Sequence, residues 1–97
     1  MIYKPSLSYD DVLLVPKYSD IISRKEVDIS AELDSVRKLD IPIISSPMDT
    51  ITESAMANSM ANAGGLGVLH RYKSIEAQAQ MARQVRDPAR KAAAIGI

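Results

Sequence analysis

The sequence contains no cysteine, tryptophan or phenylalanine, and it has a single histidine, His70. Without cysteine, these 97 residues can form no disulfide framework, no thiolate metal site and no cysteine nucleophile. The 12 basic and 12 acidic residues cancel, so no long-range field attracts nucleic acid or an anionic membrane. No apolar run approaches the roughly 18 residues of a transmembrane helix, and the first residues lack the apolar core of a signal peptide. We therefore expect a cytoplasmic protein with no nucleic-acid partner and no membrane partner.

The remaining composition is that of a globular segment. Apolar residues make up 46% of the chain, and a length of 97 residues allows at most one small domain. In residues 1–40, the apolar run VLLV at 12–15 is stopped by Pro16, and many charged residues follow it. This mixture predicts an N-terminal arm or a short hairpin.

Residues 41–97 alternate between strand and helix patterns. The β-branched run at 41–45 predicts a strand buried on both faces. Thr50 and Glu53 have the spacing of a capping box, so a helix is expected to begin there and to end at Gly64. A second strand is predicted at 66–69, followed by a helix from the N-cap Ser74 to about Arg86 and a third strand at 92–96. The second helix is expected to bury a stripe of Ile75, Ala79, Ala82 and Val85.

The order of these elements is β-α-β-α-β, with strand centres about 25 residues apart, which is typical of right-handed crossover units in a parallel sheet. A parallel strand needs cover on both faces and neighbours on both edges. Because no helix follows the last predicted strand, we expect an incomplete α/β domain.

The segment at 45–50 lies between a strand end and a helix start, which is where α/β folds bind ligands. Ser46 can donate a hydrogen bond to a ligand, and Met48 offers a polarizable surface. Asp49 and Thr50 can shape the loop at the helix N-terminus. The alternative interpretation is that the polar residues only cap the helix and that Met48 only packs.

Three other features are weaker candidates. The glycines of GGLG at 64–67 follow a helix and precede a strand, which is the reverse of a phosphate-binding fingerprint, so we reject a nucleotide motif there. His70 follows the second predicted strand, where a surface role is favoured over a ligand contact. Asp10 and Asp11 lack further metal ligands at suitable spacing and are interpreted as a solvated turn or cap.

Three blocks of the sequence, YDDVLLVP at 9–16, IISSPMDTITE at 43–53 and GGLGVLH at 64–70, closely resemble the IMP dehydrogenase/GMP reductase family. The blocks occur in the family's order, and the resemblance covers nearly the whole chain. It implies a (β/α)8 TIM barrel, of which this chain is an incomplete part. Residues 1–40 would be the N-terminal arm, and residues 41–97 would be the first two β/α units and the third strand.

The resemblance also implies a chemistry. In this family a purine nucleotide is oxidised or reduced at C2 through a thioimidate on a cysteine, and hydride passes to or from a nicotinamide cofactor. Ser46 and Met48 would contact the nucleotide, with Met48 against the purine ring. Asp49 and Thr50 would shape the loop, and His70 would lie near the site.

The same resemblance limits what these residues do alone. The cysteine loop would lie beyond residue 97, so this stretch is expected to be inactive and to contain no catalytic residue and no metal ligand. A complete version is expected to be a homotetramer that uses a monovalent cation such as potassium.

The sequence contains motifs that resemble each of the two activities of the family. SPMDTITES at 46–54 and the glycine turn resemble dehydrogenases, which oxidise IMP to XMP with NAD. SRKEVD at 23–28 resembles reductases, which convert GMP to IMP with NADPH. The CBS modules that many dehydrogenases insert near the second helix are absent, because VRDP at 85–88 leads directly to KAAAIG at 91–96. We give the loop motif more weight than the SRKEVD segment and the absence of these modules, and we therefore favour the dehydrogenase.

A hypothesis of a different class also stands. If the natural product ends at residue 97, it would be a non-catalytic piece or a domain that docks on a full-length homologue through its third strand.

Overall fold

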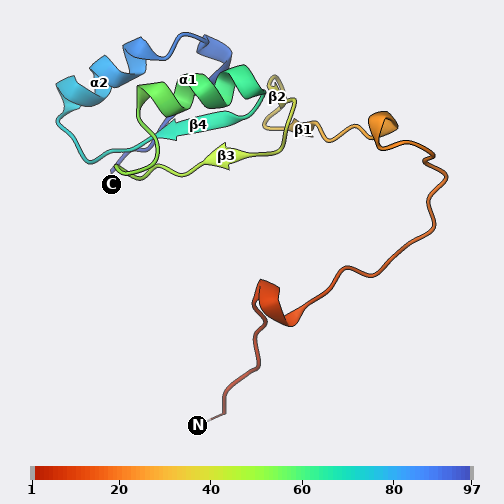
Figure 1. The fold of residues 1–97 in the computed structure, drawn as a ribbon. Helices are drawn as coiled ribbons and strands as arrows, with labels where there is room; N and C mark the ends of the chain where they lie inside the picture. The colour runs from red at the N-terminus through yellow and green to blue at the C-terminus, as the bar shows by residue number, and fades with distance from the viewer. Residues whose placement is uncertain (1, 97) are drawn as a thin grey trace.

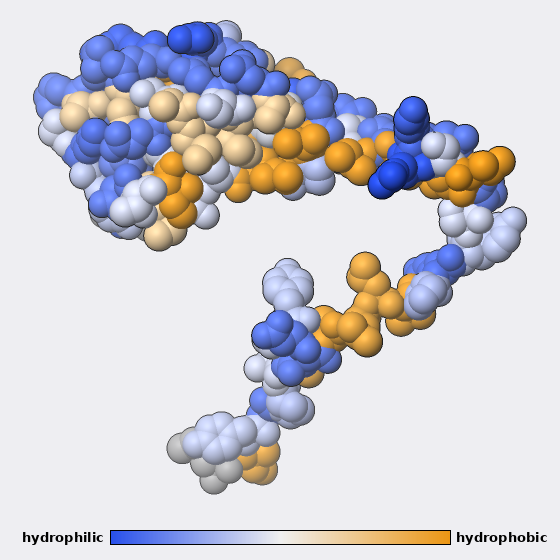
Figure 2. All heavy atoms as spheres, viewed as in Figure 1, coloured by the Kyte–Doolittle hydropathy of each residue, from blue (hydrophilic) through white to orange (hydrophobic). Residues whose placement is uncertain are grey.

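The computed structural model describes residues 2–96, which form an extended arm and a small α/β unit (Figure 1). The arm carries two short 3-10 helices, η1 (Tyr9–Asp11) and η2 (Arg24–Glu26). Beyond them, β1 (Ala31–Glu32) pairs with β2 (Lys38–Leu39) in an antiparallel hairpin. Apolar side chains recur along the exposed surface of the arm (Figure 2). The hairpin thus lies within the segment for which the sequence predicts an arm or a short hairpin.

The α/β unit contains one parallel sheet. Its elements follow the order β3 (Ile44–Ser45), α1 (Ser54–Ala63), β4 (Leu66–Leu69), α2 (Ile75–Gln84), the 3-10 helix η3 (Pro88–Arg90) and β5 (Lys91–Ala93). The strand order in space is β3-β4-β5, and both pairings are parallel. The predicted β-α-β-α-β order is therefore confirmed, with β4 as the central strand, although the third strand begins one residue earlier and ends sooner than predicted.

Two helix ends follow their local sequence signals. α1 ends at Gly64, whose φ of 94° lies in the left-handed region that glycine adopts without strain. α2 begins after Ser74, whose hydroxyl accepts a hydrogen bond from the N–H of Ala77 at 3.2 Å. These signals act within one turn of the chain, so the sequence is enough to place them.

The predicted start of the first helix is wrong. Residues 49–51 form a turn, and α1 begins only after Glu53. The N–H groups of Ile51 and Thr52 both donate to the carbonyl oxygen of Met48. The carboxylate of Glu53 contacts the next β/α unit and does not reach back to Thr50. Tertiary partners therefore replace the local capping box.

The core lies between the sheet and the two helices. Its buried apolar side chains are Ala57, Leu69, Met81 and Val85. The predicted stripe on α2 needs correction, because Ile75 is 84% exposed whereas Met81 is buried. Val85 and Ala82 of the predicted stripe do pack in the core, next to Met81. The amide of Gln78 donates to carbonyl groups at the end of the sheet.

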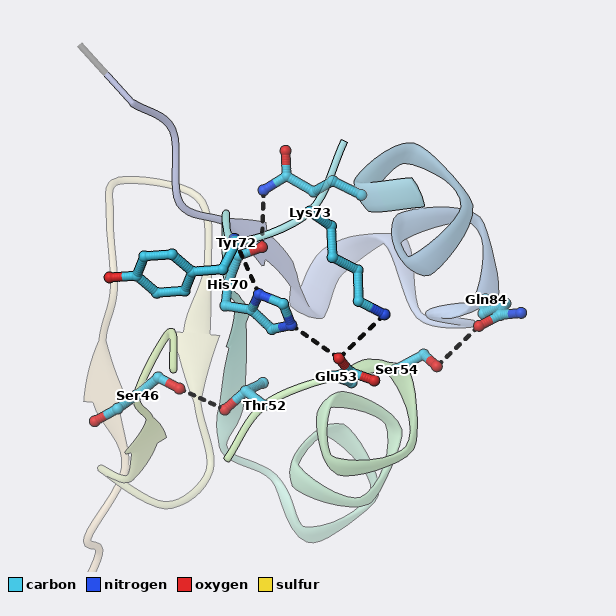
Figure 3. A network of polar contacts seen from close by, with 9 residues as sticks. Ser46, Thr52, Glu53, Ser54, His70, Tyr72, Lys73 and Gln84 are labelled. Atoms are coloured by element: carbon cyan, nitrogen blue, oxygen red, sulfur yellow. Dashed lines mark hydrogen bonds and ion pairs between the residues drawn. The ribbon is translucent and has the colours of Figure 1, made fainter. Parts of the chain in front are cut away.

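A polar contact joins the two helices. The side-chain amide of Asn58 on α1 donates to the carbonyl oxygen of Gln84, and its oxygen accepts from the N–H of Arg86, both at 3.0 Å. Ser54 adds a hydrogen bond to the Gln84 side chain at 2.9 Å (Figure 3). Because backbone groups at the end of α2 have no partners within that helix, Asn58 acts as their cap from the neighbouring helix.

The expectation that the first strand is buried on both faces is also wrong. Ile43 and Ile44 are 55% and 50% exposed. β3 is an edge strand, and both helices lie on the same face of the sheet (Figure 1). Among the described residues, only one face of the sheet is covered by helices.

Candidate functional site

The candidate site is the loop between β3 and α1, which leaves the carboxyl end of the sheet. In this loop the N–H of Met48 donates to the carbonyl oxygen of Ser46 at 2.9 Å. The carbonyl oxygen of Met48 in turn accepts two N–H groups, those of Ile51 and Thr52, each at 3.0 Å. These bonds satisfy much of the loop backbone internally and fold residues 46–52 into a compact turn. In open α/β sheets, ligands bind where such loops surround the carboxyl ends of the strands.

The four loop residues singled out by the sequence lie together on the exposed part of this turn. Ser46, Asp49 and Thr50 are exposed, and Met48 is 48% exposed. An exposed thioether is a polarizable apolar surface that suits a flat ring, and the hydroxyl of Ser46 can donate to a polar atom beside it. Their roles in binding stay predictions.

Thr52 holds the loop through two hydrogen bonds, and this role was not predicted from the sequence. Its side chain is fully buried, and its Oγ1 lies 2.6 Å from the carbonyl oxygen of Ser46 (Figure 3). The same Oγ1 lies 2.8 Å from Oγ of Ser45. The only local signal was a hydroxyl residue directly before Glu53. Its partners lie six and seven residues earlier, on the other side of an irregular loop, where no periodic pattern predicts a contact.

His70 is fully buried, so the preference for a surface role is wrong. The N–H of Tyr72 donates to Nδ1 of His70 at 3.1 Å. Because Nδ1 therefore accepts, Nε2 carries the proton and donates to Oε1 of Glu53 at 2.9 Å (Figure 3). The neutral imidazole thus joins the end of β4 to the residue before α1, and it is directed at Glu53 rather than at solvent.

Glu53 collects two donors from the second β/α unit. Beside the bond from His70, Nζ of Lys73 lies 3.2 Å from the same Oε1 atom. The hydrogen bond from His70, followed by the one from Lys73, holds the pKa of the Glu53 carboxyl below its ordinary value of 4.5. The carboxylate is therefore ionised at neutral pH and fixes the base of the loop to β4.

The ends of β4 and β5 are joined by Gln78. Its Nε2 donates to the carbonyl oxygens of His70 at 3.0 Å and Ala94 at 2.8 Å. No sequence pattern indicates this contact, because a glutamine in a helix is ordinarily a solvated residue. The three strand ends around the candidate loop are thus held by the side chains of Thr52, Glu53 and Gln78.

Two other kinds of feature are absent from the described residues. Residues 2–96 contain no cluster of three His, Asp or Glu side chains placed to hold a metal ion. In the same range, no helix has both the length and the apolar character needed to cross a bilayer. Asp11, interpreted from the sequence as part of a turn or cap, accepts hydrogen bonds from the N–H and the hydroxyl of Ser8.

Comparison with known proteins identifies the family to which the chain belongs. Residues 6–94 match the family model described as the IMP dehydrogenase / GMP reductase domain. The chain is 49% identical over 86 residues to an inosine-5'-monophosphate dehydrogenase of Nitrosopumilus maritimus, covering 89% of this chain and 18% of that protein. It is 53% identical over 83 residues to the enzyme of the same name in Bacillus subtilis, covering 86% of this chain and 17% of that protein.

Solved structures give the same result. The GMP reductase of Trypanosoma brucei in complex with guanosine 5'-triphosphate superimposes with a TM-score of 0.79 at 49% identity, over 84% of this chain and 19% of that one. Its C318A variant superimposes with a TM-score of 0.82 at 48% identity, over 89% and 19%. The chain thus spans under a fifth of the length of these relatives. With the family model matching most of its length, the chain belongs to the IMP dehydrogenase/GMP reductase family.

Proposed function

We propose that the chain forms the first part of a (β/α)8 barrel and supplies one wall of the nucleotide site of a purine-nucleotide oxidoreductase. The favoured activity is that of an IMP dehydrogenase, which converts IMP, NAD and water to XMP and NADH. In this proposal residues 1–40 are the N-terminal arm and residues 41–97 begin the barrel. The observation that carries it is the rigid turn at 46–52, which presents Ser46 and Met48 at the carboxyl end of a parallel sheet.

The proposed roles follow from the exposed atoms of the turn. Ser46 donates its hydroxyl to an oxygen of the nucleotide, and the thioether of Met48 packs against the purine ring. Asp49 and Thr50 shape the turn between them. His70 acts through its hydrogen bond to Glu53, and it contributes to the site only by holding the end of the loop next to α1.

The longer protein would also use a nicotinamide cofactor, NAD in a dehydrogenase and NADP in a reductase. When bound, that cofactor accepts or donates the hydride. The turn suits the nucleotide, because it offers one hydroxyl and one apolar surface for a ring. We assign no residue of this chain to the cofactor, to a potassium ion or to the nucleophile. The role of the loop residues is to hold and orient the nucleotide.

GMP reductase is the alternative activity, and a specific observation favours it. The two solved structures described above are both GMP reductases, at 48–49% identity. Against this, the dehydrogenases of Nitrosopumilus and Bacillus reach 49% and 53% identity. The loop motif SPMDTITES leads us to keep the dehydrogenase as the favoured activity.

The first experiment measures the intact mass of the product of the native gene, expressed in its own host. A mass several times 10.6 kDa would support a longer barrel enzyme, and a mass equal to it would favour the non-catalytic piece. The purified protein is then assayed for IMP-dependent reduction of NAD and for NADPH-dependent conversion of GMP. We expect the first reaction; activity only in the second would replace the dehydrogenase by the reductase.

The Ser46→Ala variant tests the site itself. Loss of one hydrogen bond to the nucleotide is expected to raise its KM about tenfold. Ser59→Ala, on the exposed surface of α1, is the matched control and should leave the KM unchanged. An unchanged KM in Ser46→Ala would remove Ser46 from the proposed site.

A further inference from the structure

Thr52 has a fully buried side chain that contacts the candidate loop, and nothing in the proposed chemistry uses it. Its Oγ1 has two neighbours, the carbonyl oxygen of Ser46 at 2.6 Å and Oγ of Ser45 at 2.8 Å. A carbonyl oxygen can only accept, so the single hydroxyl proton of Thr52 goes to Ser46. The hydroxyl of Ser45 must then donate to Thr52. The three groups form a directional chain that ends on the backbone of Ser46.

This chain leaves the peptide after Ser46 little freedom. Its carbonyl oxygen accepts from Oγ1 of Thr52 and from the N–H of Met48, so both acceptor positions are occupied. A carbonyl held by two donors restrains the plane of its peptide, and with it the backbone from which the Ser46 side chain projects. The same two bonds bring Ser46 and Met48, the two proposed nucleotide contacts, into one rigid unit.

Thr52 is itself held in place by the sheet and the loop. Its N–H donates to the carbonyl oxygen of Met48 at 3.0 Å. Its Cγ2 methyl lies beside Gly67 of β4, where a Cβ atom added to the glycine would come within 3.2 Å of it. The methyl group is thus packed against the central strand, and the hydroxyl is directed at the loop. One side chain connects the rigid sheet to the residues that face a ligand.

We propose that Thr52 is a positioning residue, which holds the carbonyl of Ser46 so that Ser46 and Met48 are ordered before the nucleotide binds. The proposal rests on the proposed function, because it assumes that these two residues contact the nucleotide. Ordering a loop in advance removes an entropy cost from binding, so Thr52 sets nucleotide affinity without touching the nucleotide.

The test compares two substitutions that remove different parts of the side chain. Thr52→Val keeps the shape and both branches but removes the hydroxyl, whereas Thr52→Ser keeps the hydroxyl and removes the methyl. Binding of IMP and of GMP to the purified gene product is measured by titration calorimetry, beside its thermal unfolding. We expect Thr52→Val to weaken nucleotide binding about tenfold and Thr52→Ser to stay within about twofold of the unsubstituted protein. A residue that only filled space would give the opposite order, because serine leaves a cavity and valine does not.

The outcomes separate the two proposals. If the unsubstituted protein binds neither IMP nor GMP, the proposed function falls and the role of Thr52 falls with it. If the unsubstituted protein binds and Thr52→Val binds equally well, only the positioning role is overturned. Should Thr52→Val fail to fold, Thr52→Cys is compared with Thr52→Ser, because the two have similar size and a buried thiol is a weak donor. Weaker binding by the cysteine variant supports the proposal, and equal binding overturns it.

Discussion

Gly67 is a position at which the packing of α1 on the sheet is sensitive to one added atom. A Cβ atom on this residue of β4 would lie 2.7 Å from Cα and 3.1 Å from Cβ of Ala57, and 3.2 Å from Cγ2 of Thr52. Carbon atoms in favourable contact are about 3.5–4.0 Å apart. The closest clash is with the backbone of α1, which cannot move by rotating a side chain. We therefore expect Gly67→Ala to force α1 away from the sheet.

Two opposing effects determine the magnitude. Overpacking a well-filled core costs about 1–3 kcal/mol, and a clash with backbone atoms belongs at the upper end of that range. Alanine in a strand regains about 0.5–1 kcal/mol over glycine, because the glycine loses more conformational freedom on folding. The clash dominates, and the net loss in free energy of unfolding is about 2 kcal/mol. With a urea dependence of about 2 kcal/mol per molar, the unfolding midpoint should fall by about 1 M.

The assay is urea unfolding of the purified gene product followed by far-ultraviolet circular dichroism. Gly96→Ala is the matched control, because the nearest atom to its added Cβ is the end of the flexible Arg71 side chain at 3.4 Å. This control should lie within about 0.5 kcal/mol of the unsubstituted protein. An unfolding midpoint for Gly67→Ala equal to or above that of the control would refute the close approach of α1 to β4.

Two further predictions concern other contacts of the α/β unit. Asn58→Ala removes the cap on the end of α2 and should lower the free energy of unfolding in urea by about 1–2 kcal/mol. The control Asn62→Ala, on the exposed side of α1, should lower it by under about 0.5 kcal/mol. Equal effects of the two substitutions would contradict the cap. The lowered pKa of Glu53, caused by hydrogen bonds from His70 and then Lys73, stabilises the fold above pH 4.5, and this contribution is lost as the pH falls through the folded-state pKa. The difference in unfolding midpoint between the unsubstituted protein and Glu53→Gln should therefore shrink as the pH is lowered below 4.5. A difference that grows would contradict the contacts of the Glu53 carboxylate with His70 and Lys73.

Much of the fold was predictable, because several of its signals are local. The glycine at 64 ends α1 in a left-handed conformation, and the hydroxyl of Ser74 caps α2. The apolar run at 66–69 forms β4 with the predicted bounds. Each of these signals acts over at most four residues, so no knowledge of the rest of the chain was needed.

Two predictions on the helices failed. Thr50 and Glu53 have the spacing of a capping box, yet Glu53 is bound by His70 from another β/α unit. Ile75 has the helical phase of Ala82 and Val85, which pack in the core, yet its own side chain in the first turn of α2 is 84% exposed. For Glu53, a partner distant in the sequence outweighs the local preference.

The sequence by itself determined the order of strands and helices, the positions of their clearest ends and the loop in which a ligand site is expected. These features depend on hydrophobic period and on turn residues, which are properties of short segments. Only the tertiary structure decided that Thr52 lies under Ser46 and that His70 is buried against Glu53. His70 meets Glu53 because parallel strands bring residues far apart in the chain to the same edge of a sheet. Thr52 meets Ser46 because the turn at 46–52 folds back on itself, and no local pattern encodes either contact.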